Sequence, residues 1–244
     1  IMLGWSLGGY PSPNLELVDM LGKNKDMPFE KAVEKVANNR YGPFGPTVAK
    51  AWRLFSTAFK EFPYHVGVVY TAPLQAGPSN LLWSFETNYK ATMVGLPYDD
   101  LASWRSIYPE AVFTSQLEKV CNGFAEGVSL LNDIIKGKND NDSKKQVIKE
   151  INIAESILLH YRSIINQSNF IIKKRSLKDS DLGVVKSELR TILKSEIAIA
   201  LRLAEIQGAD SRIGFEASNQ YFYVPQDLFE KMLNCSKLID FYKG

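Results

Sequence analysis

The sequence predicts a mainly α-helical protein, in which a long antiparallel helical bundle follows an irregular region of helices and loops. Three observations predict this class. Prolines are concentrated before residue 110, and only Pro225 follows Pro109; proline is excluded from helix interiors, so the second part is free to form long helices. Apolar residues recur there at helical spacing. Short polar segments separate the periodic stretches, as between antiparallel helices. We divide the chain into residues 1–110, a loop-rich connecting region, and residues 111–244, the bundle.

The opening residues, 1–7, form an apolar run that predicts a β-strand rather than a frayed terminus. A single strand cannot satisfy its own backbone hydrogen bonds. We therefore expect its partner strands upstream of residue 1 or on another chain.

Three helices are expected in the first part, over residues 14–21, 29–39 and 48–62. Ser12 or Asn14 caps the first of these, and Thr47 caps the third. The third places Trp52 on an apolar face with its neighbours at helical spacing. Residues 64–97 are expected to be irregular apart from one short strand at 66–70, and a segment of this length is often functional.

Four helices are expected in the second part, from Pro109 to about residue 135, over 145–174, from Asp179 or Ser180 to about 208, and over 226–241. The polar segment 136–144 is a turn. The last helix is expected to pack across the bundle.

Composition excludes several function classes. The formal net charge is +2, so nothing demands nucleic acid or an anionic membrane as a partner. No apolar run approaches the roughly 20 residues of a bilayer span. Phosphate-loop, dinucleotide-binding and metal-ligand motifs are absent, so no cofactor and no metal are expected. Cys121 and Cys235 are expected to be buried small apolar residues. His160, on a predicted helix, is expected to be structural, whereas His65 lies in a loop and is more open to function.

The first group of candidate binding residues lies at the start of the chain. Trp5 and Tyr10 flank a glycine turn, and Asn14 and Glu16 follow closely. Sugars present apolar faces ringed by hydroxyls, which aromatic rings and polar side chains recognise together. The alternative is that the two aromatic residues only cap a core.

Further candidates lie in the irregular segment and just after it. Asn80 and Trp83 combine a polar side chain with an aromatic ring beside Gly and Pro; the alternative is a surface turn anchored by a buried Trp83. Tyr98 and Asp99 precede a helical stretch. Asp99 and Asp100 could serve acid–base chemistry, or they could cap that helix.

These segments resemble the C-terminal part of large glycoside-hydrolase-like proteins of bacteria. The resemblance rests on GWSLGGYPSPNLEL, AWRLFSTAFKEFPYH, APLQAGPSNLLW, GLPYDDLASWRSIYP and DSRIGFEASNQYFYVPQDL. It implies that residues 1–7 are the last strand of a (β/α)8 barrel that precedes a helical domain, with residues 8–14 at the face where barrels place their sites. The residues that the resemblance places around a sugar are Trp5, Tyr10, Asn80, Trp83, Tyr98 and Asp99.

The sequence thus favours the C-terminal portion of a carbohydrate-active enzyme, with carbohydrate and the upstream part of the protein, or another chain, as partners. Catalytic carboxylates are not assigned, because a glycosidase of this kind usually carries them on earlier strands. The alternative is a non-catalytic helical protein-interaction module, since the regular bundle over residues 111–207 contains no obvious site of its own.

Overall fold

A computed structural model describes residues 12–69, 71–89, 99–137, 142–178, 181–216, 220–221 and 223–243. The chain is mainly α-helical, as predicted. The expected strand at residues 1–7 and the candidate residues Trp5, Tyr10 and Tyr98 lie outside the described residues. The short elements of the first part are α1 (Pro13–Lys23), α2 (Phe29–Tyr41), η2 (Gly42–Phe44), α3 (Gly45–Phe59), α4 (Val66–Val69), α5 (Ala72–Ala76), η3 (Gly77–Ser79) and α6 (Leu101–Trp104).

Four longer helices make up most of the second part: α7 (Glu110–Ile135), α8 (Asp142–Arg175), α9 (Leu182–Ala209) and α10 (Pro225–Phe241). A 3₁₀ turn, η4 (Ser176–Lys178), follows α8. Between α9 and α10, β1 (Phe215–Glu216) pairs antiparallel with β2 (Gln220–Tyr221). Within the described residues, this pair is the only sheet, and no barrel strand is seen among them.

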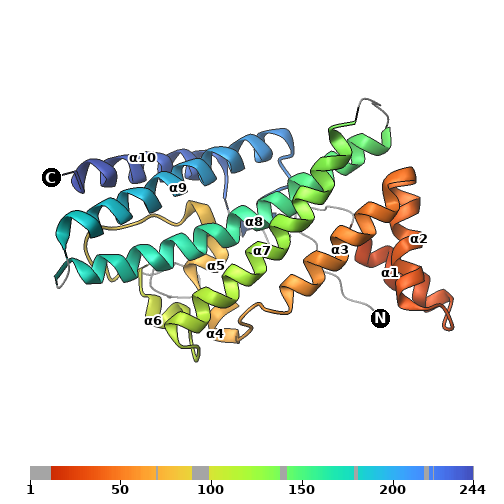
Figure 1. Ribbon diagram of the computed structural model, residues 1–244, viewed down its shortest axis with the longest axis horizontal. Helices are drawn as coiled ribbons and strands as arrows, with labels where there is room; N and C mark the ends of the chain where they lie inside the picture. The colour runs from red at the N-terminus through yellow and green to blue at the C-terminus, as the bar shows by residue number, and fades with distance from the viewer. Residues whose placement is uncertain are drawn as a thin grey trace.

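The helices lie side by side in nearly the order of the chain (Figure 1). α8 packs between α7 and α9, α3 packs on the far side of α7, and α10 lies along α9. The expectation that the last helix packs across the bundle was wrong, because α10 runs lengthwise against α9. α1 and α2 extend from the α3 edge at the opposite end from α4 and α6.

Capping residues set several helix starts. The Ser12 side chain accepts a hydrogen bond from the Asn14 backbone at 3.2 Å, as predicted for the first helix. Asp100 caps α6 by accepting from the backbones of Ala102 and Ser103, which confirms the capping alternative for that residue. Asp181 caps the start of α9, and the predicted start residues, Asp179 and Ser180, lie outside the described residues. Thr47 lies inside α3, which begins at Gly45 without a side-chain cap.

The apolar core crosses the predicted boundary at residue 110. Val48 and Ala51 of α3 pack with Leu131 of α7 and Val147 of α8 in one buried cluster. Trp104, Phe113, Leu117 and Ile164 are among the fully buried side chains that join α6 of the first part to α7 and α8. The first part and the bundle therefore share buried apolar contacts, which supply most of the driving force for packing.

The predicted strand at residues 66–70 was wrong for the residues that the structure describes. Val66–Val69 forms a single helical turn, α4, in which the His65 carbonyl accepts hydrogen bonds from the backbones of Val68 and Val69. A valine-rich run favours a strand by local preference. Here the fully buried Val68 packs against Leu101 and Trp104, and this tertiary contact outweighs the local preference.

Both cysteines are free and buried, as predicted. Burial raises the pKa of the Cys121 and Cys235 thiols to about 12, so both stay protonated at neutral pH.

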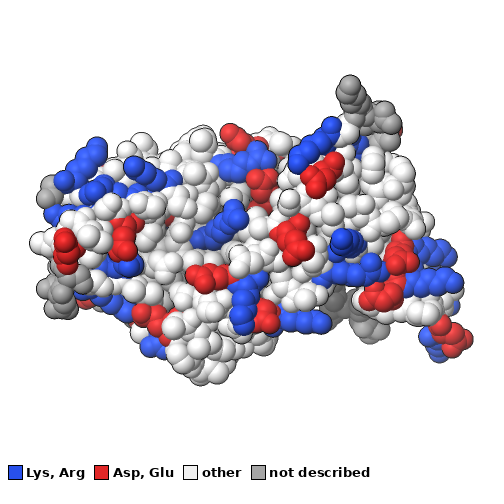
Figure 2. Space-filling model, in the orientation of Figure 1, with Lys and Arg blue, Asp and Glu red and all other residues white. Residues whose placement is uncertain are grey.

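None of the described helices is both long and apolar enough to cross a membrane. On the face shown in Figure 2, acidic and basic side chains are interspersed, in keeping with the small net charge.

His160 of α8 is the structural histidine that the sequence predicted. Its Nε2 lies 2.9 Å from the Leu74 carbonyl oxygen. Gly77, at φ +49°, leaves no room for a side chain, because an added Cβ would lie 2.3 Å from the imidazole Nδ1. Burial lowers the pKa of His160 to about 4. The ring is therefore neutral in the folded chain and donates its Nε2 proton to Leu74.

This burial predicts a pH dependence of stability. Between the ordinary histidine pKa of 6.5 and the folded value of about 4, the unfolded chain binds a proton that the folded chain does not. The free energy of unfolding should therefore fall as the pH is lowered through this window, by up to about 3 kcal/mol from this group. Urea unfolding at several pH values, with His160→Gln as the non-titrating control, should show a steeper loss for the unsubstituted chain. Parallel pH curves for the two chains would contradict the prediction.

Candidate functional site

An ion pair with no exposure to solvent lies between α9 and α10. Glu196 Oε2 and Lys231 Nζ are 2.9 Å apart, and both side chains are 0% exposed. The Lys231 ammonium also donates to the Asn80 carbonyl oxygen. A buried ion pair lowers the stability of a fold unless its remaining donors and acceptors make hydrogen bonds. The surrounding hydrogen bonds therefore decide whether this pair stabilises the folded chain.

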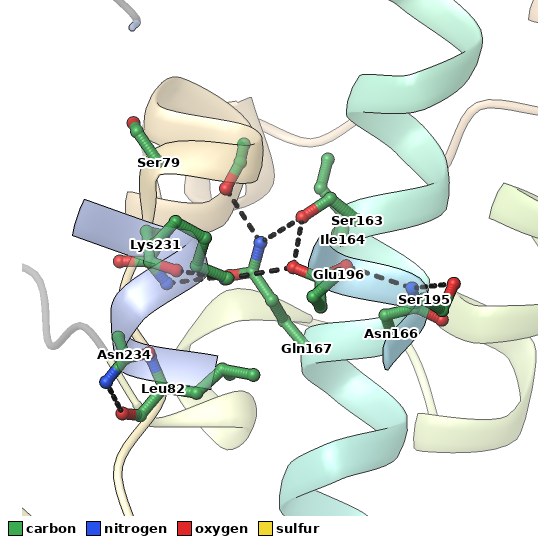
Figure 3. Close-up of polar contacts among 12 residues, drawn as sticks. Ser79, Leu82, Ser163, Ile164, Asn166, Gln167, Ser195, Glu196, Lys231 and Asn234 are labelled. Carbon is green, nitrogen blue, oxygen red and sulfur yellow. Dashed lines mark hydrogen bonds and ion pairs between the residues drawn. The ribbon is translucent and has the colours of Figure 1, made fainter. Parts of the chain in front are cut away.

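Side chains of α8 donate hydrogen bonds to the Glu196 carboxylate from the side opposite Lys231 (Figure 3). Ser163 donates to Glu196 Oε2 at 2.8 Å, and Asn166 donates to Glu196 Oε1 at 2.9 Å. Gln167 links this group to the irregular segment, because it accepts from the Asn80 amide at 2.7 Å and donates to the Gly77 carbonyl at 2.8 Å. We call Asn80, Ser163, Gln167, Glu196 and Lys231 the buried polar network.

The network fastens the segment after η3 to three helices at once. Asn234 of α10 adds a reciprocal pair of bonds, since its side chain accepts from the Leu82 backbone N–H at 3.0 Å and donates to the Leu82 carbonyl at 2.9 Å. The five members of the network are all buried. Its hydrogen bonds are made within the protein and do not face solvent, so its role is to position segments rather than to receive a substrate.

A second buried carboxylate lies at an open groove. Glu150 of α8 is 8% exposed and accepts two short hydrogen bonds, from the Tyr41 hydroxyl and the Trp52 indole N–H, both at 2.6 Å. The Tyr41 and Trp52 rings meet edge to face with centroids 5.8 Å apart. Hydrogen bonds to an ionised carboxylate are among the stronger ones, so Glu150 fixes the orientation of the Trp52 ring.

The groove beside Trp52 has a volume of about 530 Å³. Its lining includes Asn14 and Leu17 of α1, Phe29 and Glu30 of α2, Trp52, Arg53 and Phe55 of α3, and Glu150 of α8. We call it the Trp52 groove. Arg53 binds Glu30 at 2.6 Å and Glu34 at 2.9 Å on its rim. The groove thus combines aromatic rings with hydrogen-bonding side chains of both charges.

The two predicted residues on α1 lie at or near this groove. Asn14 is exposed and lines it. Glu16 is paired with Arg40 of α2 at 2.7 Å, and this pair helps to hold α1 against α2. Asn14 and Glu16 were expected to act with Trp5 and Tyr10, which the structure does not describe.

The structure places Trp83 and Asp99 in one region and Asn80 in the buried polar network. The Trp83 ring contacts those of Phe85 and Tyr89 edge-on, with centroids 5.9 and 5.2 Å apart. Asp99 accepts from the Thr87 backbone at 2.9 Å and from the Thr87 hydroxyl at 3.0 Å. Asp99 therefore holds Thr87, which lies between Phe85 and Tyr89 in the chain. Asn80 lies 2% exposed in the buried polar network.

Trp52 and Glu150 are the functional candidates that the sequence did not single out. Trp52 reads as one more member of an apolar helical stripe, and Glu150 lies nearly a hundred residues away. The only sequence signal was the polar run Arg53, Ser56 and Thr57 beside the tryptophan. In the part of the chain that the structure describes, no three His, Cys, Asp or Glu side chains are grouped so that they could hold a metal ion.

Comparison with known proteins gives no relative for this chain. No protein-family model, no curated protein and no solved structure matches it. The function is therefore argued from the residues and their geometry.

The buried polar network predicts a large cost for removing one charge. Lys231→Met leaves the Glu196 carboxylate buried without its cation, so the free energy of unfolding should fall by about 3–5 kcal/mol. Adding Glu196→Gln to that variant should recover part of the loss, because no buried charge then remains. Urea unfolding measures both changes. Lys243→Met is the control, since Lys243 and its partner Asp240 are 65% and 68% exposed, and it should change stability by less than about 1 kcal/mol. Equal effects at the two lysines would contradict the prediction.

Proposed function

We propose that this chain binds carbohydrate in the Trp52 groove, as the C-terminal part of a glycoside-hydrolase-like enzyme. The observation that carries the proposal is the Trp52 ring, which Glu150 holds in place in an open groove of about 530 Å³. The sequence resemblance to carbohydrate-active enzymes supports the same class of ligand.

The groove matches the chemistry of a sugar ring. Trp52, Phe29 and Phe55 offer apolar ring surface for the C–H faces of a pyranose. Asn14 and the Arg53–Glu30 pair offer donors and acceptors for hydroxyls. A ring held by a hydrogen bond before the ligand arrives loses little conformational freedom on binding, which favours affinity.

The groove suits binding better than bond cleavage. Glycoside hydrolysis uses two carboxylates on either side of the scissile bond. Here Glu30 is neutralised by Arg53 at 2.6 Å, and Glu150 is occupied by Tyr41 and Trp52. We therefore assign no catalytic role to either carboxylate.

In the same proposal, residues 1–7 are the last strand of a (β/α)8 barrel, and the helical part described above packs beside it. Trp5 and Tyr10 then join Asn14 and Glu16 beside the Trp52 groove, whereas Tyr98 belongs with Trp83 and Asp99 in a region outside the groove. Trp83 and Asp99 already share one loop region through the aromatic contacts of Trp83 and the Thr87 hydrogen bonds of Asp99.

One substitution tests the groove without disturbing the core. Phe29 is 56% exposed and lines the groove, and Phe229 on α10 is 51% exposed and lies elsewhere. Screening on a glycan array, followed by calorimetric titration with the oligosaccharide that binds, should show that Phe29→Ala weakens binding about tenfold, the loss expected for one aromatic contact. Phe229→Ala should leave the affinity unchanged.

Other outcomes would count against the proposal. If the unsubstituted chain binds no glycan, carbohydrate binding by this chain is excluded under those conditions. If Trp83→Ala abolishes binding and Phe29→Ala does not, the site is the loop around Trp83 rather than the groove.

A helical interaction module is the second candidate function, and one observation favours it. Phe229, Leu233 and Phe241 on α10 are 51%, 72% and 63% exposed. The first two are four residues apart and the third follows two turns later, so they share the outer face of the helix. Exposed apolar side chains in such a row mark contact surfaces. Capture of a protein partner that Leu233→Asp abolishes, together with no glycan binding, would favour this function.

A further inference from the structure

A serine and a histidine from distant parts of the chain meet outside the Trp52 groove. His65 precedes α4, and Ser106 lies in the turn between α6 and α7. The Ser106 hydroxyl oxygen is 2.8 Å from His65 Nδ1, and both residues are partly exposed. Serine at hydrogen-bond distance from histidine is the arrangement from which enzymes make a nucleophile.

The neighbouring hydrogen bonds fix the direction of proton transfer. The Gly67 backbone N–H, which can only donate, lies 3.0 Å from the same Nδ1. His65 Nδ1 must therefore be an acceptor, so the neutral ring carries its proton on Nε2. It follows that Ser106 donates its hydroxyl proton toward the ring, which is the direction a general base requires.

The backbone at Ser106 is held in an unusual conformation. Its φ is +50°, and in the described part of the chain only Asn88 is another non-glycine residue at positive φ. Asparagine tolerates this region well, whereas for serine it is uncommon and costs energy. Gly67 permits the close approach, because a Cβ there would lie 2.7 Å from the Ser106 hydroxyl oxygen. The fold therefore maintains this contact against a local preference.

A candidate oxyanion donor lies next to the serine. The Ile107 N–H makes no backbone hydrogen bond within the described residues, whereas those of Ser106 and Tyr108 do. Backbone N–H groups beside the attacking oxygen stabilise the negative charge that develops on a carbonyl oxygen. The Ile107 N–H is adjacent to Ser106 in the chain, and we assign it this role in the proposal below.

Exposed apolar side chains lie on both loops around the pair. Tyr64, Val66 and Ile107 are 75%, 65% and 70% exposed, and the Tyr108 hydroxyl binds the Tyr64 carbonyl at 2.8 Å, which holds the two loops together. In Figure 2, the tip of the lobe at the lower edge, where Figure 1 places α4 and α6, shows no charged side chain. A small uncharged substrate could reach the serine from this side.

We propose that Ser106 and His65 form a nucleophile and base that hydrolyse esters of short acyl chains. As Ser106 Oγ bonds to the ester carbonyl carbon, its proton moves to His65 Nδ1, and the carbonyl electron pair moves onto oxygen toward the Ile107 N–H. The intermediate collapses, the bond to the alcohol breaks, and the alcohol takes the proton from His65. Water then attacks the acyl-serine with the same base, which releases the carboxylic acid and restores the serine hydroxyl.

The pair could instead serve only to join the two loops, and one substitution separates the two roles. Ser106→Gly removes the nucleophile and places glycine where φ is positive, so folding should be retained. The probes are p-nitrophenyl acetate, followed by absorbance, and diisopropyl fluorophosphate, followed by intact mass. We expect ester turnover and addition of one diisopropylphosphoryl group, both lost in Ser106→Gly with an unchanged melting temperature.

A second variant and a control complete the test. His65→Gln should lower the rate of ester hydrolysis about 100-fold, the usual contribution of a general base. Ser236→Ala, at an exposed serine on α10, should leave the rate and the labelling unchanged. No labelling of the unsubstituted chain, or equal turnover by Ser106→Gly, would overturn the proposal. Neither result would bear on carbohydrate binding in the Trp52 groove, which the Phe29 variant tests separately.

Discussion

Two carboxylates inside the helical bundle, those of Glu196 and Glu150, are each held by hydrogen-bonding side chains from other helices. A carboxylate removed from water needs hydrogen-bond donors around it. Without them, its desolvation costs more free energy than its burial provides. Glu196 forms an ion pair with Lys231 and accepts hydrogen bonds from serine and asparagine side chains of α8. Glu150 accepts hydrogen bonds from Tyr41 and Trp52. The first carboxylate thereby fastens the segment after η3 to the bundle, and the second sets the orientation of the ring that lines the groove.

The long helices could be predicted because their causes are local. Apolar stripes at helical spacing marked α7, α8, α9 and α10, and Pro109 and Pro225 marked two of their starts. The turn at α4 could not be predicted in this way. Its valines favour a strand by themselves, and only the packing of Val68 against α6 makes the helical turn favourable. Local preference therefore determines the conformation of the long periodic segments, whereas tertiary contacts determine the conformation of a short segment such as α4.

The candidate sites depended on pairings that no local pattern contains. Asn14 was singled out from the sequence, and it does line the groove. Its most important neighbour, Trp52, reads in the sequence as an ordinary core residue, because its partner Glu150 lies on another helix. Asn80 was chosen for its polar surroundings, yet in the fold it joins the Gln167 amide in a buried position. A polar residue beside glycine and proline therefore does not reveal whether its side chain faces solvent.

The Trp52 groove and the serine–histidine pair lie on different elements of the chain. The groove is built on α1, α2, α3 and α8, and the pair is built on the loops at α4 and α6. In Figure 1, α1 and α2 lie at the opposite end of α3 from α4 and α6. In the groove, the Trp52 ring is held in place by Glu150. At the pair, a backbone at positive φ brings the Ser106 hydroxyl to the His65 imidazole. Both depend on contacts between segments that are far apart in the sequence.

If Trp52, held by Glu150, contacts bound sugar as we propose, its indole N–H responds directly to the ligand. The side-chain N–H signals of the four tryptophans can be followed separately in a ¹⁵N-labelled sample during titration with an oligosaccharide, after assignment by substitution. The Trp52 signal should shift and saturate as the oligosaccharide is added, while the signal of Trp104, which is fully buried, should stay in place. A saturable shift of other tryptophan signals with none at Trp52 would contradict the proposal.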